Sequence, residues 1–317
     1  MVTVLVGHTG FVGSNLTAQT KFDACFNSSN IADSYGLKPD LLIYAGVRSE
    51  MFTANHEPQK DLERIEEAAN NMMKIAPAKV VLISTVAVYA KPFGLNVNES
   101  SPAIGNEKVS AYGENRFYLE QRIRESFKEY LIVRLPAIYG INIKKNFIYD
   151  MIRFVPGLLK EEKYQELSAK SALIERSYIP RGDGFYSLAV ESKDKAHFSE
   201  LKREFEKVGF SALNFTDSRS RYQFYNLHFL WSHIQCALEL SIKTINLVTE
   251  PLTAAEVFHY VNGGEFKNEI SDSPYNYDLR TQYFDKFGGE NGYIFDKQFV
   301  LDDLKDFINK EKEKTEL

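Results

Sequence analysis

Three side chains in the first half of the chain have residue types and a spacing suited to proton transfer. Tyr112 and Arg116 lie four residues apart in a segment with helical periodicity, so both project from one face of the predicted helix. Thr85 ends an apolar run that is typical of a buried strand. A phenol is a poor base near neutral pH, and a nearby cation favours its phenolate. The spacing of Tyr112 and Arg116 therefore places a cation where it could favour the phenolate of Tyr112.

Three glycines near the N-terminus have the spacing of a phosphate-binding turn. The segment V-T-V-L-V-G-H-T-G-F-V-G places Gly7, Gly10 and Gly13 between a predicted strand and a predicted helix. Gly7 would permit the tight turn, Gly10 the approach of a pyrophosphate, and Gly13 the close packing of helix on strand. The positive end of the helix dipole favours an anion there. We expect a nicotinamide dinucleotide, NAD or NADP, at this turn; the alternative is an ordinary strand-to-helix turn without a ligand.

The elements that must position these residues follow from the apolar pattern. Apolar runs at 2–6, 40–45, 79–84 and 131–135 alternate with helical patterns that include 61–75 and 112–130. Continuous apolar strands separated by helices indicate a parallel sheet covered on both faces. The sequence therefore predicts the α/β class, with a Rossmann doubly wound parallel sheet and a smaller C-terminal α/β substrate domain.

The pattern changes near residue 154 and suggests a division into two domains. We expect an NAD(P)-binding Rossmann domain at 1–155, with about 224–249 returning to it, and a substrate-binding domain at 156–223 and 250–317. In the second half, helices are expected at 160–170, 195–208, 224–240 and 252–261, with a short strand at 244–247. Thr253 is a candidate N-cap.

Composition limits the classes of partner. The chain has 317 residues, of which 44% are hydrophobic, enough for a large core. A net charge of −5 argues against a nucleic-acid partner, which needs a basic face. The two cysteines and six histidines lack ligand spacing, so no disulfide framework and no metal site are expected. The N-terminus enters a strand at once and no apolar run reaches membrane-spanning length, so we expect a cytoplasmic protein without a membrane segment.

The G-x-x-G-x-x-G spacing resembles that of the extended short-chain dehydrogenase/reductase family, whose sugar-nucleotide members are called NAD-dependent epimerases/dehydratases. Further segments resemble successive family elements in the same order. They are L-I-Y-A-G-V, V-V-L-I-S-T-V-A-V-Y, S-A-Y-G-E-N-R-F-Y-L-E, V-R-L-P-A-I-Y-G and I-N-L-V-T-E-P-L-T-A-A-E-V. The resemblance covers roughly the first 140 residues well and the rest only in patches.

The resemblance implies a role for each candidate residue. Tyr112 would be the general acid/base, and Thr85 would hydrogen-bond the reacting oxygen. Arg116 takes the place of the family's Lys, which binds the nicotinamide ribose and lowers the Tyr pKa; Arg keeps the charge but cannot relay a proton. Beside Tyr112 and Arg116, the implied cofactor-binding residues are Gly7, Thr9, Gly10, Phe11, Val12, Gly13, Asn27, Ser28, Ala45, Gly46, Pro136 and Ile138.

Two departures from the family pattern narrow the chemistry. The 4,6-dehydratases of the family carry an Asp-Glu pair after the Thr, and the GDP-fucose synthase type carries a Cys two positions after its Ser. Here those positions are Val86 and Ala87, which cannot transfer protons. Hydride transfer at a carbinol or ketone carbon remains, as in a C4-epimerase or a keto-sugar reductase.

The cofactor half is short between Gly13 and the strand at 40–45. The segment A-C-F-N-S-S-N is expected to hold the second strand, and it ends in Asn27 and Ser28 where an NAD site usually has Asp or Glu. No Arg is present there for a 2′-phosphate, so NAD and NADP both remain open.

The substrate side is the least regular part of the resemblance. Arg219 and Arg221 are the nearest candidates for a substrate diphosphate, because Arg pairs suit phosphate oxygens, and Val86 and Tyr89 are expected at the sugar. The main hypothesis is an NAD(P)-dependent oxidoreductase or epimerase of a nucleotide sugar. The alternatives are a catalytically weak NAD(P)-binding protein of the same fold and a reductase of a non-nucleotide carbonyl. The family also implies a homodimer through the Tyr112 helix.

Overall fold

The computed structural model describes residues 1–90, 92, 97–103, 109–189 and 195–316. The chain divides into two compact units, which are described one at a time. Unit 1 comprises 1–143, 221–252 and 276–300, and unit 2 comprises 144–220, 253–275 and 301–317.

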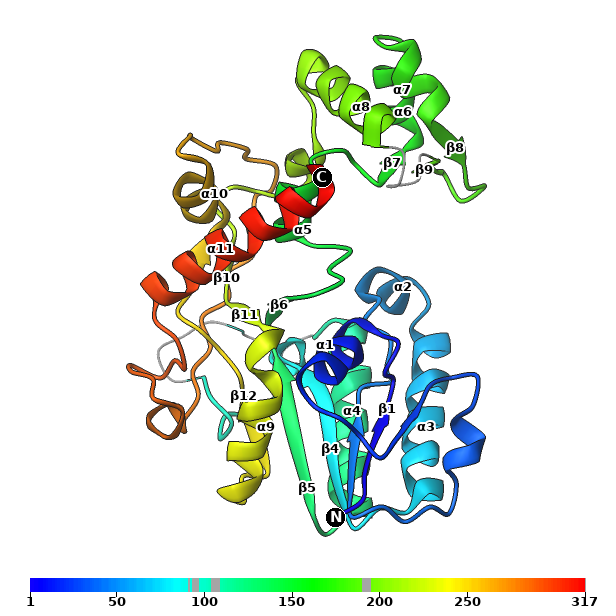
Figure 1. Cartoon of the computed structure of the whole chain (residues 1–317), viewed down its shortest axis with the longest axis vertical. Helices are drawn as coiled ribbons and strands as arrows, with labels where there is room; N and C mark the ends of the chain where they lie inside the picture. The colour runs from blue at the N-terminus through cyan, green and yellow to red at the C-terminus, as the bar shows by residue number, and fades with distance from the viewer. Residues whose placement is uncertain (91, 93–96, 104–108, 190–194, 317) are drawn as a thin grey trace. The chain divides into compact units, whose positions relative to one another are not determined.

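A six-stranded sheet forms the centre of unit 1, and every neighbouring pair of its strands is parallel. Its order is β12-β5-β4-β3-β1-β2, so the direction of winding reverses at β1 (Figure 1). In such sheets the ligand crevice lies beyond the carboxyl ends of the strands at the reversal. The strands are β1 (Thr3–Val6), β2 (Ala24–Phe26), β3 (Leu41–Tyr44), β4 (Lys79–Thr85), β5 (Tyr130–Leu135) and β12 (Thr244–Asn246).

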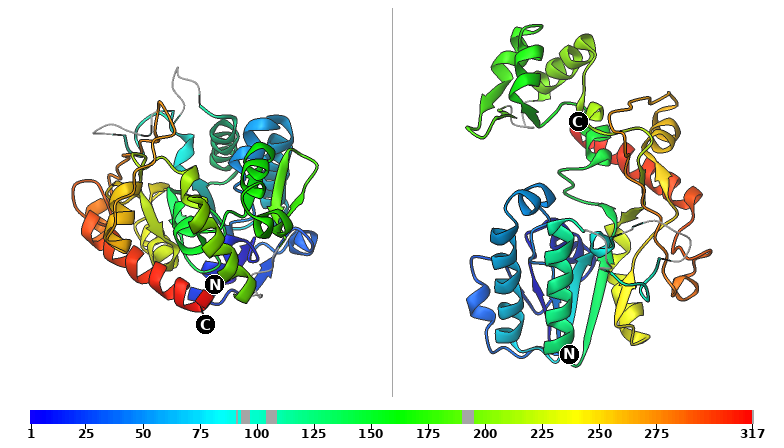
Figure 2. Two further views of the ribbon diagram at one scale, coloured as in Figure 1. Left: turned by 90° about the horizontal axis from the view of Figure 1, so that it is seen from above. Right: turned by 180° about the vertical axis from the view of Figure 1, so that it is seen from behind.

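Helices cover both faces of this sheet, because neighbouring strand residues point to opposite sides (Figures 1 and 2). Leu5 packs on one side with α1 (Phe11–Gln19) and α9 (Leu230–Glu239). Val4 and Val6 pack on the other with α3 (Pro58–Ile75) and α4 (Ala111–Ser126). The expected doubly wound α/β fold is thereby confirmed. Unit 1 also contains α2 (Met51–His56), η1 (Ile31–Ser34), η2 (Val86–Val88), β6 (Ala137–Tyr139), β10 (Arg221–Tyr222), η4 (Leu227–Phe229) and η5 (Phe284–Phe287).

The segment between α1 and β3 contains one short strand and one helical turn. β2 is confirmed within A-C-F-N-S-S-N, but it is only three residues long and lies at the edge of the sheet. The single turn η1 follows it and the chain then enters β3, so the described chain has no strand beyond β2.

One expected element is wrong. The helix expected over 224–240 begins only at Leu230, and the preceding residues form β11 (Phe224–Asn226), which pairs in parallel with β6. Phe224 and Tyr225 are adjacent and both fully buried, an arrangement that a strand buried on both faces allows.

Unit 2 has a small core of its own. A three-stranded antiparallel sheet, β7-β9-β8, packs with three helices around Leu159, Leu201 and Phe205. The elements of unit 2 are α5 (Phe147–Arg153), β7 (Leu158–Lys160), α6 (Glu161–Ser168), α7 (Ala172–Ser177), β8 (Tyr178–Pro180), β9 (Phe185–Leu188), α8 (Lys195–Val208), η3 (Ala212–Phe215) and α10 (Ala254–Asn262). β13 (Leu252–Thr253) and α11 (Lys297–Glu316) each cross a boundary between the units along the chain.

The unit boundaries and the expected domains differ in one long segment. Residues 276–300 belong to unit 1, because Ile294 and the half-buried rings of Phe287 and Phe295 pack into the core around α9.

Thr253 is confirmed as an N-cap, and it forms a capping box with Glu256. No helix in the described part of the chain is long and apolar enough to span a bilayer.

Candidate active site

The glycine-rich turn follows β1 and leads into α1. Gly7 is buried with φ +91°, and a Cβ atom there would lie 2.5 Å from the carbonyl oxygen of Ala45. Its N–H donates to the carbonyl of Phe26 at 2.7 Å, and the His8 ring nitrogen Nδ1 lies 3.0 Å from the same oxygen. The turn is therefore fixed between the carboxyl ends of β2 and β3, at the reversal point of the sheet.

The base of this turn is packed, but its tip is exposed to solvent. Thr9 and Gly10 are exposed, and a Cβ on Gly10 would have one close neighbour, the Gly7 carbonyl oxygen at 3.2 Å. Gly10 is the N-cap of α1 and provides no side-chain cap, and the first turn of α1 has no acidic residue. These features fit a dinucleotide, because the first N–H groups of the helix and its dipole are left for an anion.

The loop after β2 carries the expected polar residues. The Asn27 side-chain oxygen accepts from the Ser29 N–H at 2.9 Å and from its hydroxyl at 2.6 Å, while Ser28 is exposed. Neither residue provides a carboxylate for ribose hydroxyls or a cation for a 2′-phosphate.

A buried amide that sequence reasoning missed ties α1 to another predicted cofactor segment. Asn15 donates to the carbonyls of Phe11 and Ile141, each at 2.8 Å, and accepts from the Ile141 N–H at 3.0 Å. It thereby fixes the loop that follows β6, downstream of Pro136 and Ile138. Polar residues within an otherwise apolar helix face are the signal that could have indicated it.

Tyr112 and Thr85 are brought together as the sequence predicted. Thr85 ends β4, and its side chain accepts the Ala87 N–H at 3.1 Å, which begins η2. Tyr112 stands in the first turn of α4, where its own N–H donates to Asn55 of α2, and the Thr85 side chain beside the Tyr112 hydroxyl slightly lowers the pKa of that hydroxyl. Both hydroxyls therefore lie at the carboxyl edge of the sheet, the same edge that carries the glycine turn.

Arg116 has a partner that sequence reasoning missed. Its guanidinium lies over the Tyr112 ring, with Cζ 4.4 Å from the ring centroid. It also makes a two-pronged ion pair with Asp61 of α3, at 2.9 Å and 3.2 Å, and donates to the Arg48 carbonyl at 2.6 Å. Asn115 adds a hydrogen bond to the same carboxylate at 2.9 Å. The signal in the sequence was a carboxylate one turn before Ile65, on the apolar face of α3.

The environment of Tyr112 acts against its ionisation. Burial raises the pKa of the Tyr112 hydroxyl above its ordinary value, and Arg116 lowers that pKa by a smaller amount, while Asp61 raises it. The depressed phenol pKa that the cation was expected to produce is therefore absent from this structure. The reason is that desolvation outweighs a cation whose charge Asp61 neutralises.

A buried polar network lies beneath these residues and connects β4, α4 and β5. Glu120 accepts from Arg134 at 2.6 Å and 2.9 Å and from the Ser84 hydroxyl at 2.7 Å. Arg134 also donates to the Tyr89 hydroxyl at 2.6 Å, and Tyr89 in turn contacts the side chain of Asn246. The network fixes the residue before Thr85 and the helix that carries Tyr112.

Comparison with known proteins gives a result in structure but none in sequence. No protein-family model matches the chain, and no curated protein matches it. Among solved structures, the dTDP-4-dehydrorhamnose reductase of Bacillus anthracis in complex with NADP is similar over 97% of each chain, with a TM-score of 0.63 and 16% identity.

Two further structures are similar over nearly their full lengths. The UDP-glucose 4-epimerase of Thermotoga maritima with UDP-glucose gives a TM-score of 0.59 at 12% identity, over 99% of each chain. RMD of Pseudomonas aeruginosa complexed with NADPH gives 0.62 at 12% identity, over 99% of this chain and 100% of that one. This chain has the fold of the extended short-chain dehydrogenases/reductases. The fold expected from the sequence motifs is confirmed.

Within this fold, two predicted substrate residues of unit 1 are enclosed by protein. Val86 and Tyr89 are each only 4% exposed, and the Tyr89 hydroxyl is occupied by the network around Arg134. These contacts support a structural role for Tyr89 in the extended dehydrogenase fold. Contact of either side chain with a sugar remains a prediction.

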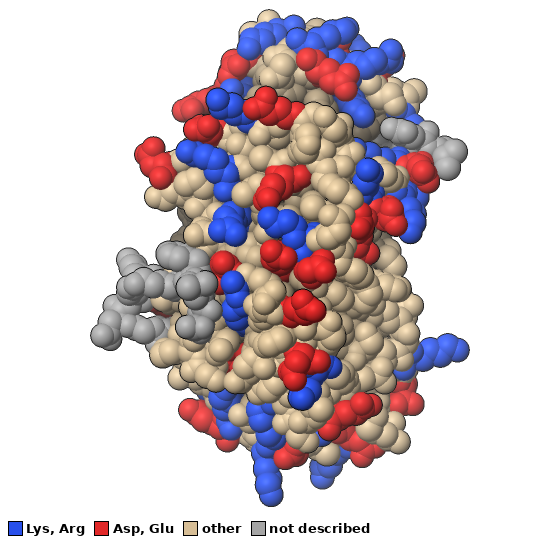
Figure 3. Space-filling view, turned by 90° about the vertical axis from the view of Figure 1, so that its left-hand side faces the viewer, with Lys and Arg blue, Asp and Glu red and all other residues tan. Residues whose placement is uncertain are grey.

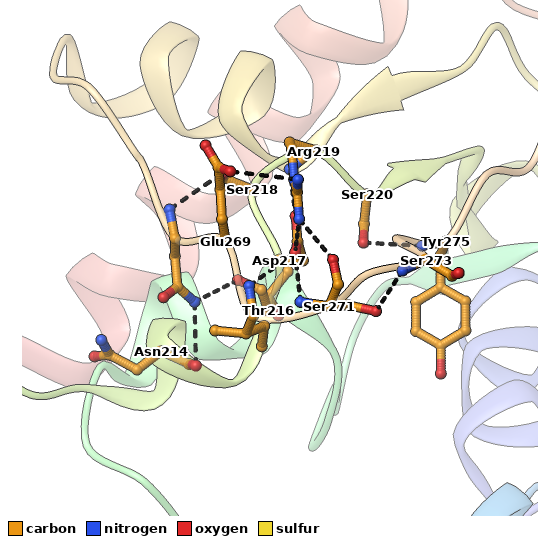
Figure 4. Close-up of polar contacts among 12 residues, drawn as sticks. Asn214, Thr216, Asp217, Ser218, Arg219, Ser220, Glu269, Ser271, Ser273 and Tyr275 are labelled. Atoms are coloured by element: carbon orange, nitrogen blue, oxygen red, sulfur yellow. Dashed lines mark hydrogen bonds and ion pairs between the residues drawn. The ribbon is translucent and has the colours of Figure 1, made fainter.

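The predicted diphosphate residue Arg219 is bound within unit 2. It forms a two-pronged ion pair with Asp217, at 3.0 Å and 2.8 Å, and also contacts Glu269 and the Ser271 carbonyl (Figure 4). The Asp217 carboxylate accepts from the backbone N–H groups of Ile270 and Ser271 as well, so it joins two loops. Arg221 is exposed and lies in unit 1, so the two arginines belong to different units.

Proposed function

We propose that this protein is an NAD(P)-dependent oxidoreductase or epimerase that acts on a nucleotide sugar. The observation that carries the proposal is that Tyr112 lies beside Thr85 at the same sheet edge as an open glycine-rich turn. That edge is where extended dehydrogenase folds bind their ligands. The similar structures of a reductase with NADP and an epimerase with UDP-glucose support the same cofactor and substrate class.

Different residues would bind the cofactor and transfer the proton. The turn from Gly7 to Gly13 would hold the pyrophosphate at the start of α1, and Ala45 and Gly46 would border it. A nicotinamide cofactor, when bound, supplies or accepts a hydride. Thr85 would hydrogen-bond the reacting oxygen, and Tyr112 would give that oxygen a proton or take one from it. Val86 and Ala87 leave no acidic pair for the elimination of water.

The proposal is tested by binding and turnover measured together. Calorimetry with NAD, NADH, NADP and NADPH should show tight binding of at least one form. A screen of UDP-, GDP- and dTDP-linked sugars and their 4-keto derivatives should then show turnover that Tyr112→Phe abolishes while cofactor affinity stays near that of the wild type. Absence of binding by all four cofactor forms would overturn the proposal.

A second candidate is a catalytically weak NAD(P)-binding protein of the same fold. The neutralised guanidinium of Arg116 and the raised pKa of Tyr112 favour it. Tight cofactor binding without hydride exchange across the whole sugar screen would select this candidate. Simple ketones added to the screen would reveal a reductase of a non-nucleotide carbonyl, because such an enzyme would reduce them at least as fast as the nucleotide-linked keto sugars.

We also propose a cytoplasmic homodimer that pairs through α4 and has no nucleic-acid partner. The family resemblance supports the dimer, and the acidic net charge of −5 supports the absence of a nucleic-acid partner. Basic and acidic side chains are also interspersed on the face drawn in Figure 3. Light scattering would contradict the dimer if it gave the mass of one chain at micromolar concentration.

A further inference from the structure

We propose that Asp61 is a positioning residue of this site: it neutralises the Arg116 guanidinium beside the Tyr112 ring and thereby fits Tyr112 to donate a proton to a carbonyl oxygen. The inference rests on the proposed function and narrows it to the reduction of a ketone. It assigns a role to a residue that the sequence pattern of the site does not include.

The geometry of the Asp61 carboxylate is that of a fixed partner for Arg116. The side chains of Asp61 and Arg116 are 8% and 6% exposed, and two guanidinium N–H groups reach both carboxylate oxygens. Asn115 donates to Asp61 and also to the Pro58 carbonyl, so it holds the carboxylate at the start of α3. A two-pronged, water-excluded pair of this kind has one preferred arrangement.

The ion pair of Arg116 and Asp61 lies beside the Tyr112 ring and has no net charge. Arg116 faces Tyr112 from the same helix, Asp61 faces it from α3, and Thr85 of β4 is an uncharged neighbour. From α2, the Asn55 side chain contacts only the backbone N–H of Tyr112. A lone cation within about 4–6 Å would favour the phenolate by one to three pKa units, but a cation paired with a carboxylate at this distance provides much less.

The protonation state decides which direction of reaction Tyr112 can assist. When a ketone is reduced, its oxygen becomes a hydroxyl and must receive a proton, so a neutral phenol is the competent form. When an alcohol is oxidised, the hydroxyl must lose a proton, so a phenolate is the competent form. Burial of Tyr112 raises its pKa, which preserves the neutral phenol over the whole neutral range. The site is therefore built for the reductive direction, and a carbinol epimerase, which needs both directions, fits it less well.

The test measures the ionisation of Tyr112 directly and needs no substrate. Protein labelled with ¹³C at tyrosine Cζ is titrated by NMR, and the Tyr112 signal is assigned by its loss in Tyr112→Phe. Asp61→Asn should lower the pKa of Tyr112 by about one unit or more, because the Arg116 charge is no longer balanced. Asp61→Glu should restore the wild-type titration. Glu63→Gln is the matched control, because it removes an exposed carboxylate from the same helix.

Three outcomes separate the possibilities. A Tyr112 pKa in Asp61→Asn that equals or exceeds the wild-type value overturns the inference, whatever the cofactor results are. If Asp61→Asn does not fold, Asp61→Ser removes the same charge with a smaller side chain and is subject to the same criterion. A lowered pKa in a protein that binds no cofactor would uphold the positioning role and overturn only the proposed function. In an active enzyme, the rate of ketone reduction by Asp61→Asn should decline at a lower pH than that of the wild type, by the same shift.

Discussion

Gly13 lies so close to Gly7 that a Cβ atom added to it would be 2.1 Å from the Gly7 carbonyl oxygen. The first turn of α1 therefore passes against the end of β1 with no room for a side chain. This contact explains why the turn needs glycine at its last position for packing, independent of any ligand.

Gly13→Ala should therefore destabilise the protein. The methyl group meets backbone atoms that cannot move aside, so we expect a loss of at least about 2 kcal/mol in the free energy of unfolding, as for an overpacked core. Gly10→Ala is the matched control, because its methyl would approach only the Gly7 oxygen at 3.2 Å. Urea denaturation measures both variants. A wild-type midpoint for Gly13→Ala would contradict the packing role.

Gly10→Val should weaken cofactor binding more than it weakens the fold. The valine side chain would project from the exposed tip of the turn, where the pyrophosphate is proposed to lie. We expect a fall in affinity of at least about tenfold, equivalent to about 1.4 kcal/mol, for whichever nicotinamide cofactor binds the wild type. Calorimetry gives the affinity and thermal unfolding gives the stability. Unchanged affinity in the folded variant would place the cofactor elsewhere.

Glu120→Gln should be strongly destabilising, although Glu120 touches no proposed ligand. Its carboxylate is fully buried and accepts hydrogen bonds from Arg134, Ser84 and Arg124. The substitution therefore leaves the charge of Arg134 without its partner. Removal of one partner from a buried pair costs about 3–5 kcal/mol. Glu125→Gln, an exposed change on the same helix, should be nearly neutral. Equal unfolding midpoints for the two variants would show that the network contributes little.

Incubation with dTDP-glucose or GDP-mannose should yield no 4-keto-6-deoxy sugar. Val86 and Ala87 follow Thr85 in η2, and neither can move the protons that the elimination of water requires. Mass spectrometry of the products checks the expectation, because the loss of water lowers the sugar mass by a fixed amount. Formation of the keto-deoxy product at an enzymatic rate would show that another group supplies the acid and the base.

His233 should make the protein less stable in acid. Burial lowers the pKa of its ring to about 4 from the ordinary 6.5, and the ring is bonded to the Tyr225 hydroxyl at 2.9 Å. The unfolded chain therefore binds a proton that the folded chain does not, and stability is lost as the pH falls from about 6.5 to 4. Relative to wild type, His233→Phe should flatten the unfolding free energy across this window. The exposed His228→Gln should not, and parallel curves for the wild type and His233→Phe would rule out the linkage.

The elements of the fold could be predicted because their signals are local. The apolar runs that became β1, β3, β4 and β5 and the helical pattern of α3 are properties of short segments. The spacing of the turn glycines is likewise a local signal, and so is Thr253, whose capping box forms with Glu256 three positions later. The strand β11 was missed because two adjacent buried aromatics, Phe224 and Tyr225, fit a buried strand and a buried helix equally well.

The chemistry of the candidate site depended on contacts that no local pattern contains. The sequence by itself determined the glycine turn, the strand that ends at Thr85, and a helix that presents Tyr112 and Arg116 on one face. Only the tertiary structure decided that Arg116 forms an ion pair with Asp61, 55 positions away, and that Tyr112 is buried. The pKa of a side chain depends on solvation and on charges within a few ångströms, and packing between separate elements sets both of these.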